Sequence, residues 1–440
     1  MPIDRRRLLT GSLAGAAILA APVSAYGLDA AQFGVRPGAP DDQSRALQRA
    51  IDEAARRRTP LMLAPGVYRA GDLKLPSGAH VAGVRGATRL MLTRGPSLLS
   101  SAHAETVTLS GLTLEGGNQP LAEHRGLVHF NTTKSLRVAD CVILAAGGNA
   151  IAMEQCDGEV THNAVTGAAD NALFCIDSRG VSITANIIRG SGNGGIRVWQ
   201  SDKRRDGSLI ADNQIEDTAA RAGGSGQNGN AINVFRAADV IVRGNHIRKA
   251  AFSAIRGAAA SNIQIVGNNC AALDEVAIYS EFDFENALIA DNTIDGARAG
   301  ISVTNFKEGG RLAMVRGNVV RNIAPRQDDK GNGVGIGVEA DSTVTGNTVE
   351  KAANIGISAG WGEYLRDVIV QGNVVKQSGI GVAVSVVKGA GTAVIAGNVL
   401  AGSRRAAIVG MEWNKVVTGD LALAGAERYP QLRLSGNQVM

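Results

Sequence analysis

The stretch AINVFRAADVIVRGNHI, from Ala231 to Ile247, decides the fold. Ile232 and Val234 alternate with other residues on a short apolar run, and a turn and a second run lead to Asn245 and Ile247. Alternation of this kind is typical of β-strands with one buried face. Most of the chain after residue 80 repeats the same unit.

An asparagine that stands two positions before an apolar residue marks each repeat. These anchors are Asn163, Asn186, Asn213, Asn245, Asn268, Asn292, Asn318, Asn347, Asn373, Asn398 and Asn437. From Asn163 to Asn398 the intervals range from 23 to 32 residues. Three short strands in a repeat of this length predict a solenoid of parallel strands, with one coil per repeat. Leucine-rich repeats have a recurring leucine pattern that is missing here, and a β-propeller needs a longer period with antiparallel strands.

We therefore predict an all-β fold, a single-stranded parallel β-helix of about fourteen coils over residues 81–440, roughly 65 Å long at ~4.8 Å per coil. Asparagine suits a sharp turn because it tolerates the left-handed conformation, and stacked amides can hydrogen-bond along the axis as a ladder. The anchors are accordingly assigned to structure.

Composition agrees with a coiled architecture. Glycine accounts for 56 of 440 residues and aromatic residues for only 4%, which suits many tight turns around a core of aliphatic side chains. Of the four cysteines, Cys175 and Cys270 fall on inward positions of the repeat, so we expect small core hydrophobes and no disulfides. Histidines at ligand spacing and columns of aspartates are missing, so no metal or other cofactor is predicted.

The first 25 residues are predicted to be an export signal. Arg5 and Arg6 precede a weakly apolar run, and Val23-Ser24-Ala25 offers a cleavage site before Tyr26, as in twin-arginine signals. The apolar run is too short for a stable membrane anchor; a simple basic tail is the alternative. Removing residues 1–25 lowers the formal net charge from +5 to +3, which indicates neither nucleic acid nor an anionic membrane as partner. We expect a periplasmic or secreted protein, exported folded.

Residues 26–80 are predicted to cap the solenoid. A helix over about residues 42–57 has an apolar face, with Asp41 and Asp42 as candidate caps rather than a metal pair. Phe33 to Val35, this helix and the later PGVY motif together resemble the N-terminal segment of pectate-lyase-like right-handed parallel β-helix proteins. The resemblance implies that the helix covers the open end of the first coil, which would otherwise expose strand edges.

The chain as a whole resembles the twin-arginine-translocated (TAT) repetitive protein family. The most distinctive stretches run over residues 223–245, 275–292 and 300–313. The resemblance covers essentially all 440 residues and implies the β-helix and its export, without supplying an activity. The wider superfamily includes polysaccharide lyases and hydrolases, which is an analogy of fold only.

A candidate site follows from the outward positions of the first strand of each coil. In the middle coils these positions combine aromatic and polar residues, which is typical of a ligand surface. Candidate catalytic residues are Arg256, Tyr279 and Glu281. Candidate substrate-binding residues are Arg197, Trp199, Asn233, Phe235, Arg236, Asn305, Glu339 and Trp361. Long turns before Ala231 and Val334, and further loops at the other edge, are expected to form a trough.

Two reactions would fit these residues. Arg256 or Tyr279 could exchange a proton with a uronate beside a charge stabiliser, as in a lyase. Glu281 and Glu339 lie two coils apart, ~9.6 Å by stacking, near the ~6.5–9.5 Å of inverting glycoside hydrolases. We expect an exported protein that binds an extended polysaccharide or cell-envelope glycan, with cleavage left open. The alternative is a non-catalytic envelope binding or scaffold protein, whose polar stripe is an ordinary solvated face.

Overall fold

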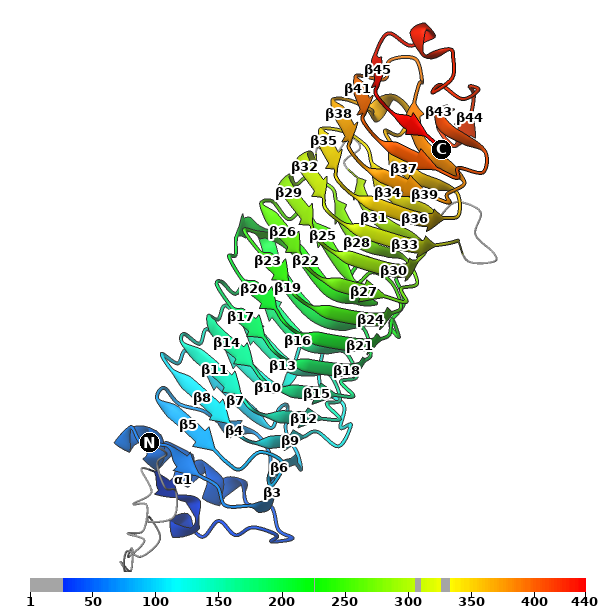
Figure 1. The fold of residues 1–440 in the computed structure, drawn as a ribbon. Helices are drawn as coiled ribbons and strands as arrows, with labels where there is room; N and C mark the ends of the chain where they lie inside the picture. Colours follow the sequence, from blue (N-terminus) through cyan, green and yellow to red (C-terminus); the bar gives the residue numbers. More distant parts are fainter. Residues whose placement is uncertain (1–26, 225, 305–309, 326–332) are drawn as a thin grey trace, which may run out of the picture.

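The computed structural model describes residues 27–224, 226–304, 310–325 and 333–440. The predicted signal, Asn305 and most of the long turn before Val334 lie outside these residues. The described chain winds into a right-handed parallel β-helix, seen as a long stack of coils (Figure 1). Three sheets of 16, 15 and 15 strands run along it, here named A, B and C. From β2 to β43 each coil contributes one strand to each sheet, which confirms the predicted solenoid, and β44 adds an antiparallel strand beside β43.

Sheet A contains β1 (Leu28–Asp29), β2 (Leu61–Met62), β5 (Ala79–Ala82), β8 (Val107–Ser110), β11 (Leu136–Ala139), β14 (Gly158–Thr161), β17 (Ser182–Thr184), β20 (Leu209–Ala211), β23 (Ile241–Arg243), β26 (Ile263–Val266), β29 (Glu285–Ala290), β32 (Arg311–Arg316), β35 (Ser342–Thr345), β38 (Val368–Gln371), β41 (Ala393–Ala396) and β45 (Leu432–Ser435). Sheet B contains β3 (Gly66–Ala70), β6 (Thr88–Leu92), β9 (Thr113–Glu115), β12 (Val142–Leu144), β15 (Ala164–Thr166), β18 (Ile187–Ser191), β21 (Gln214–Thr218), β24 (His246–Ala250), β27 (Asn269–Ala271), β30 (Thr293–Ala297), β33 (Val319–Ile323), β36 (Thr348–Ala352), β39 (Val374–Lys376), β42 (Val399–Ala401) and β46 (Gln438–Val439). Sheet C contains β4 (Leu73–Lys74), β7 (Leu99–Ala102), β10 (Gly126–Asn131), β13 (Asn149–Glu154), β16 (Asn171–Ile176), β19 (Gly194–Arg205), β22 (Asn230–Ala238), β25 (Ile255–Ala258), β28 (Val276–Glu281), β31 (Ala299–Thr304), β34 (Val334–Val338), β37 (Ile355–Ala359), β40 (Ile380–Ser385), β43 (Ala406–Glu412) and β44 (Lys415–Val416).

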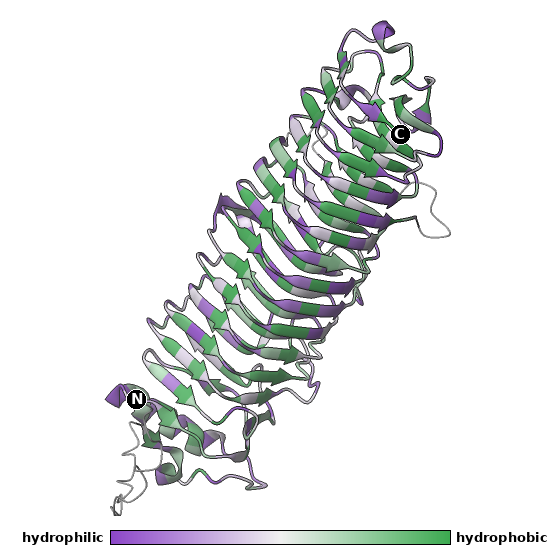
Figure 2. Ribbon diagram, viewed as in Figure 1, coloured by the Kyte–Doolittle hydropathy of each residue, from purple (hydrophilic) through white to green (hydrophobic). Residues whose placement is uncertain are grey.

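The core fills the inside of the coils. Inward residues such as Ile232, Val234 and Ile247 are fully buried, and apolar and polar bands alternate along the strands (Figure 2). All four cysteines are buried and unpaired, and burial raises the pKa of Cys270 to about 12. Cys175 and Cys270 are thus core residues, as predicted.

The asparagine ladder forms between sheets A and B. From Asn163 to Asn398, each anchor donates its side-chain amide and its backbone N–H to the Oδ1 atom of the anchor one coil further on. Each side-chain amide therefore bonds both to buried backbone groups and to the amides of the adjacent anchors. A buried turn needs such partners because its polar backbone groups are shielded from water.

The expectation that the anchors themselves take the left-handed conformation is wrong. The residue before each anchor has the positive φ instead, as at Ala185 (54°), Gly244 (63°) and Asp291 (57°). The chain bends there from a strand of sheet A to a strand of sheet B, so that the asparagine side chain can lie along the inside of the turn. Glycine and aspartate are frequent at this preceding position because they tolerate positive φ.

The predicted helix is α1 (Ser44–Arg57), which lies at the N-terminal end of the stack (Figure 1). Asp42 accepts a hydrogen bond from the Ser44 N–H at 2.9 Å, although Gln43 occupies the cap position. The remaining described helices are single turns: η1 (Ala30–Phe33), η2 (Gly362–Tyr364) and η3 (Ala426–Arg428). Within the described ranges, no helix has the length and apolarity to cross a membrane.

Candidate functional site

The outward positions predicted from the sequence lie on sheet C, where they form two columns of residues in register along the coil stack. In the first column, each residue pairs with the next one on the following strand; in order these are Arg197, Asn233, Arg256, Tyr279, Ser302, Gly337, Ser358 and Ala383. The second column pairs Trp199, Phe235, Ala258, Glu281 and Thr304. A period-two strand pattern fixes these neighbours, because a slip by one residue would turn every side chain to the other face.

Arg256 and Glu281 form a buried, two-pronged ion pair across β25 and β28. Arg256 donates from Nε to Oε1 at 2.6 Å and from Nη2 to Oε2 at 2.9 Å. The two side chains are only 10% and 4% exposed. The guanidinium also lies 5.0 Å from the centre of the Tyr279 ring and 3.9 Å from a carboxylate oxygen of Glu275. All three candidate catalytic residues are therefore in one cluster.

Burial dominates the electrostatics of this cluster. It raises the pKa of the Tyr279 phenol, which shares a hydrogen bond with Thr304. It also raises the pKa of the Glu275 carboxyl, although the nearby Arg256 charge opposes this change. Tyr279 is therefore a neutral hydrogen-bonding group at neutral pH. Glu275 is part of the cluster but did not stand out in the sequence, because it precedes its strand and lies outside both columns.

The described residues 219–224 and 226–229 of the loop before β22 cover the N-terminal part of the predicted outward positions. Arg197 donates to Asn228 Oδ1 at 2.6 Å, and Asn233 donates to the Gly226 carbonyl at 3.0 Å. Asn233 also accepts from Trp199 Nε1 at 2.9 Å. Arg197 and Asn233 are buried beneath this loop, and burial lowers the pKa of Arg197 to about 10. These two predicted binding residues support the loop and are closed to a large ligand.

A row of aromatic rings runs along the same region. Phe174, Trp199 and Phe235 follow one another with ring centres 5.9 and 5.8 Å apart. The Arg236 guanidinium lies 4.8 Å from the Phe235 ring centre and donates to the Ser201 carbonyl at 2.6 Å. Phe235 and Arg236 line a cavity of about 360 Å³ beside β19. Trp199, Phe235 and Arg236 are thus brought together, at the edge where the chain leaves sheet C.

The open groove lies further along the same face, from β28 to β44, with a volume of about 710 Å³. We call the edge of sheet C where the chain enters its strands the leading edge, and the opposite one the trailing edge. Ser302, Gly337, Ser358 and Ala383 form the groove floor, with Tyr279 beside them; Asn354 and Arg405 line the leading edge; Glu339, Trp361 and Trp413 line the trailing edge. Small floor residues leave room for a ligand between the two edges.

Two indole rings dominate the trailing edge of this groove. The Trp361 and Trp413 rings are 5.7 Å apart, edge to face, and remain 38% and 42% exposed. Exposed tryptophans that line a groove are a common way to bind a ring-shaped ligand. The sequence singled out Trp361 and Glu339, but it missed Trp413 and Arg405, which the last described coils bring back toward β37.

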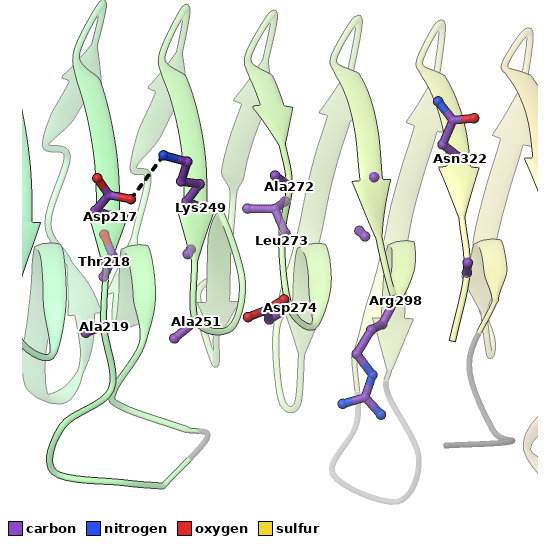
Figure 3. Close-up of a pocket in the computed structure, with 14 residues that line it drawn as sticks. Asp217, Thr218, Ala219, Lys249, Ala251, Ala272, Leu273, Asp274, Arg298 and Asn322 are labelled. Carbon is purple, nitrogen blue, oxygen red and sulfur yellow. Dashed lines mark ion pairs between the residues drawn. The ribbon is translucent and has the colours of Figure 1, made fainter. Parts of the chain in front are cut away.

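A second cavity of about 720 Å³ lies at the turn from sheet B to sheet C (Figure 3). Asp217, Lys249 and Arg298 line it together with several alanines. Lys249 is 3.5 Å from Asp217 and 3.3 Å from Glu216, so its charge is already balanced. This shallow depression offers little to hold a ligand.

Over the described ranges no cluster of three histidine, cysteine, aspartate or glutamate residues could hold a metal ion.

The fold defines this chain as a right-handed parallel β-helix protein. The family model described as "Right handed beta helix region" matches residues 149–320, whereas no curated protein matches the chain in sequence. The N-terminal fragment of bacteriophage phi29 gene product 12 is similar, with a TM-score of 0.52 and 14% identity over 94% of this chain and 71% of that chain. Tailspike protein 3 of bacteriophage CBA120 gives a TM-score of 0.52 and 12% identity over 94% of this chain and 61% of that chain. At such identities the similarity is one of fold.

Proposed function

We propose that this protein binds an extended polysaccharide or cell-envelope glycan along the groove of sheet C. The pair of exposed indoles, Trp361 and Trp413, carries the proposal. Pyranose rings present apolar C–H faces that stack on indole rings. Their hydroxyl groups would meet Ser302, Ser358 and Asn354 across the small-residue floor. The long axis of the groove follows the coil stack, which suits a linear polymer.

The proposal includes export. A twin-arginine signal over residues 1–25, and membership of the TAT repetitive protein family, would place the mature protein in the periplasm or outside the cell. Envelope glycans are the polymers available there. Detection of residues 26–440 in the periplasmic or culture fraction, and its loss when Arg5 and Arg6 are both replaced by lysine, would test this part.

Binding without cleavage is the form of the proposal that the site favours. Glu281 has both carboxylate oxygens engaged by Arg256, so use as an acid or base would first break a buried pair, at a cost of about 3–5 kcal/mol. The protein incubated with a polysaccharide panel should release neither reducing ends nor unsaturated uronates. Product that disappears in Glu281→Gln, while the variant stays folded, would instead establish a lyase or hydrolase.

The groove is tested by replacing its aromatic residues. Calorimetric titration with xylan, mixed-linkage glucan, polygalacturonate and alginate should find at least one polymer that binds. Trp361→Ala with Trp413→Ala should weaken that binding at least tenfold, about 1.4 kcal/mol, because both stacking surfaces are lost. The double variant should keep the thermal unfolding temperature within a few degrees, since both rings are surface residues.

Phe282→Ala is the matched control. Phe282 is equally exposed, at 38%, but lies at the cavity beside β19 and outside the groove. Its substitution should leave binding unchanged. Equal losses in the control and in the tryptophan variants, or no binding to any polymer, would contradict the proposed function.

A further inference from the structure

Two neighbouring arginines precede β43, and only one of them reaches the groove. Arg404 donates to the carbonyls of Gln377 and Ala353 at 3.1 and 2.7 Å. Arg405 donates from Nη2 to the Asn354 carbonyl at 3.0 Å. Both side chains therefore lie back across the preceding coil, and both are held at a defined place. Arg405 lines the groove, whereas Arg404 does not.

The Arg405 charge is not balanced by a carboxylate of the described residues. Other surface arginines do pair with an acidic residue one coil away, for example Arg321 with Asp295 at 2.7 Å and Arg366 with Asp341 at 2.7 Å. Among the described residues, the Arg405 side chain donates one hydrogen bond, to the backbone carbonyl of Asn354. A guanidinium has five N–H donors arranged as a fork, so Arg405 has further donors for a ligand in the groove that it lines.

The charges on the two edges of the groove have opposite signs. Arg405 lies on the leading edge beside Asn354, whereas Glu339 lies on the trailing edge with the two indoles. A ligand that stacks on Trp361 and Trp413 would therefore direct an anionic group toward the leading edge. A sugar ring that carries a carboxylate has both features.

We propose that Arg405 makes the groove selective for acidic glycans by binding a sugar carboxylate, an inference that rests on the proposed glycan-binding function. Guanidinium and carboxylate groups form paired, charge-assisted hydrogen bonds. Arg405 is exposed to solvent, so salt screens the interaction. Arg405 acts in recognition and has no part in bond cleavage.

The test uses pairs of polymers with one backbone and different charge. Polygalacturonate is compared with its fully methyl-esterified form, and carboxymethyl cellulose with hydroxyethyl cellulose, by calorimetric titration at 20 and 500 mM NaCl. The acidic member should bind about tenfold more tightly at low salt. Arg405→Gln should remove this difference while neutral members bind as before. Arg404→Gln, the matched control, should keep it.

The outcomes separate the two proposals. Equal binding of acidic and neutral members, or the same change in the Arg404 and Arg405 variants, would overturn acidic selectivity and leave glycan binding standing. Absence of binding to every polymer would overturn the glycan function, and the selectivity with it. Thermal unfolding of both variants within a few degrees of the parent would show that the fold is kept.

Discussion

Among single residues, Arg256 makes the contacts that hold the buried cluster on the outer face of sheet C together. Its charge is held between Glu281 and Glu275 and above the Tyr279 ring. Such an arrangement fixes the Tyr279 side chain at the N-terminal end of the groove. Arg256 and Glu281 therefore act as positioning residues in the proposed function, and Tyr279 is the member of the cluster that faces a ligand.

The buried pair gives a stability prediction. Arg256→Ala should lower the free energy of unfolding by about 3–5 kcal/mol, because Glu281 is left as an uncompensated buried charge. Replacing both residues, Arg256→Met with Glu281→Leu, should cost much less. Urea unfolding followed by circular dichroism measures both effects.

The control for this prediction is the exposed pair of Arg311 and Glu285, whose side chains are 55% and 57% exposed. Arg311→Ala should change the free energy of unfolding by less than about 1 kcal/mol. If Arg256→Ala and Arg311→Ala lower the free energy of unfolding by similarly small amounts, burial of the Arg256–Glu281 pair does not add to its effect on stability.

Among the structural elements, the asparagine ladder is the feature that joins successive coils. Asn268 illustrates its bonding: the amide donates to Asn292 Oδ1 and to the Val242 carbonyl, both at 3.0 Å. Its own Oδ1 accepts from the backbone and side chain of Asn245. Removal of the Asn268 amide thus leaves the Asn245 backbone N–H without its acceptor and takes one hydrogen bond each from Asn292 Oδ1 and the Val242 carbonyl.

Asn268→Ala should therefore destabilise the protein by at least about 1–3 kcal/mol, the cost of a buried group that is left unsatisfied. Asn269→Ala is the matched control, because Asn269 is the next residue and its side chain is exposed at the start of β27. The control should change stability by no more than about 0.5 kcal/mol. Indistinguishable unfolding midpoints of the two variants would refute a bonding role for the ladder.

At the scale of the whole molecule, the N-terminal end of the solenoid differs from its middle because none of the described residues forms a coil before it. Helix α1 covers this end, with Leu47, Ala50, Ile51 and Ala54 buried. An uncovered coil would present unpaired strand edges and apolar side chains to other molecules. The helix therefore protects the stack from association.

Ile51→Asp should detach this cap, since it places a carboxylate in a buried apolar position. We expect a lower unfolding temperature and high-molecular-weight species in size-exclusion chromatography. Arg45→Asp, an exposed change on the same helix, should leave the elution volume unchanged. An Ile51→Asp protein that elutes and melts like the parent would show that the cap is dispensable.

The sequence by itself determined the coil. Alternating aliphatic residues and the recurring asparagines predicted the solenoid and the inward positions of Cys175 and Cys270. They also predicted that Arg256, Tyr279 and Glu281 lie on adjacent coils. The reason is physical: the repeat sets the register, and in a parallel stack the register sets which residues lie side by side. Even so, the sequence analysis placed the left-handed conformation at each asparagine, whereas the structure has it at the residue before each asparagine.

Tertiary structure alone decided which outward positions a ligand can reach. Arg197 and Asn233 belong to the same column as Ser302 and Ser358, yet the described part of the loop before β22 covers the first two. Trp413 and Arg405 join the groove because their side chains reach back toward an earlier coil. Loop paths and long side chains follow no period, so the repeat predicts the column of residues that forms the groove floor but does not predict which side chains close its edges.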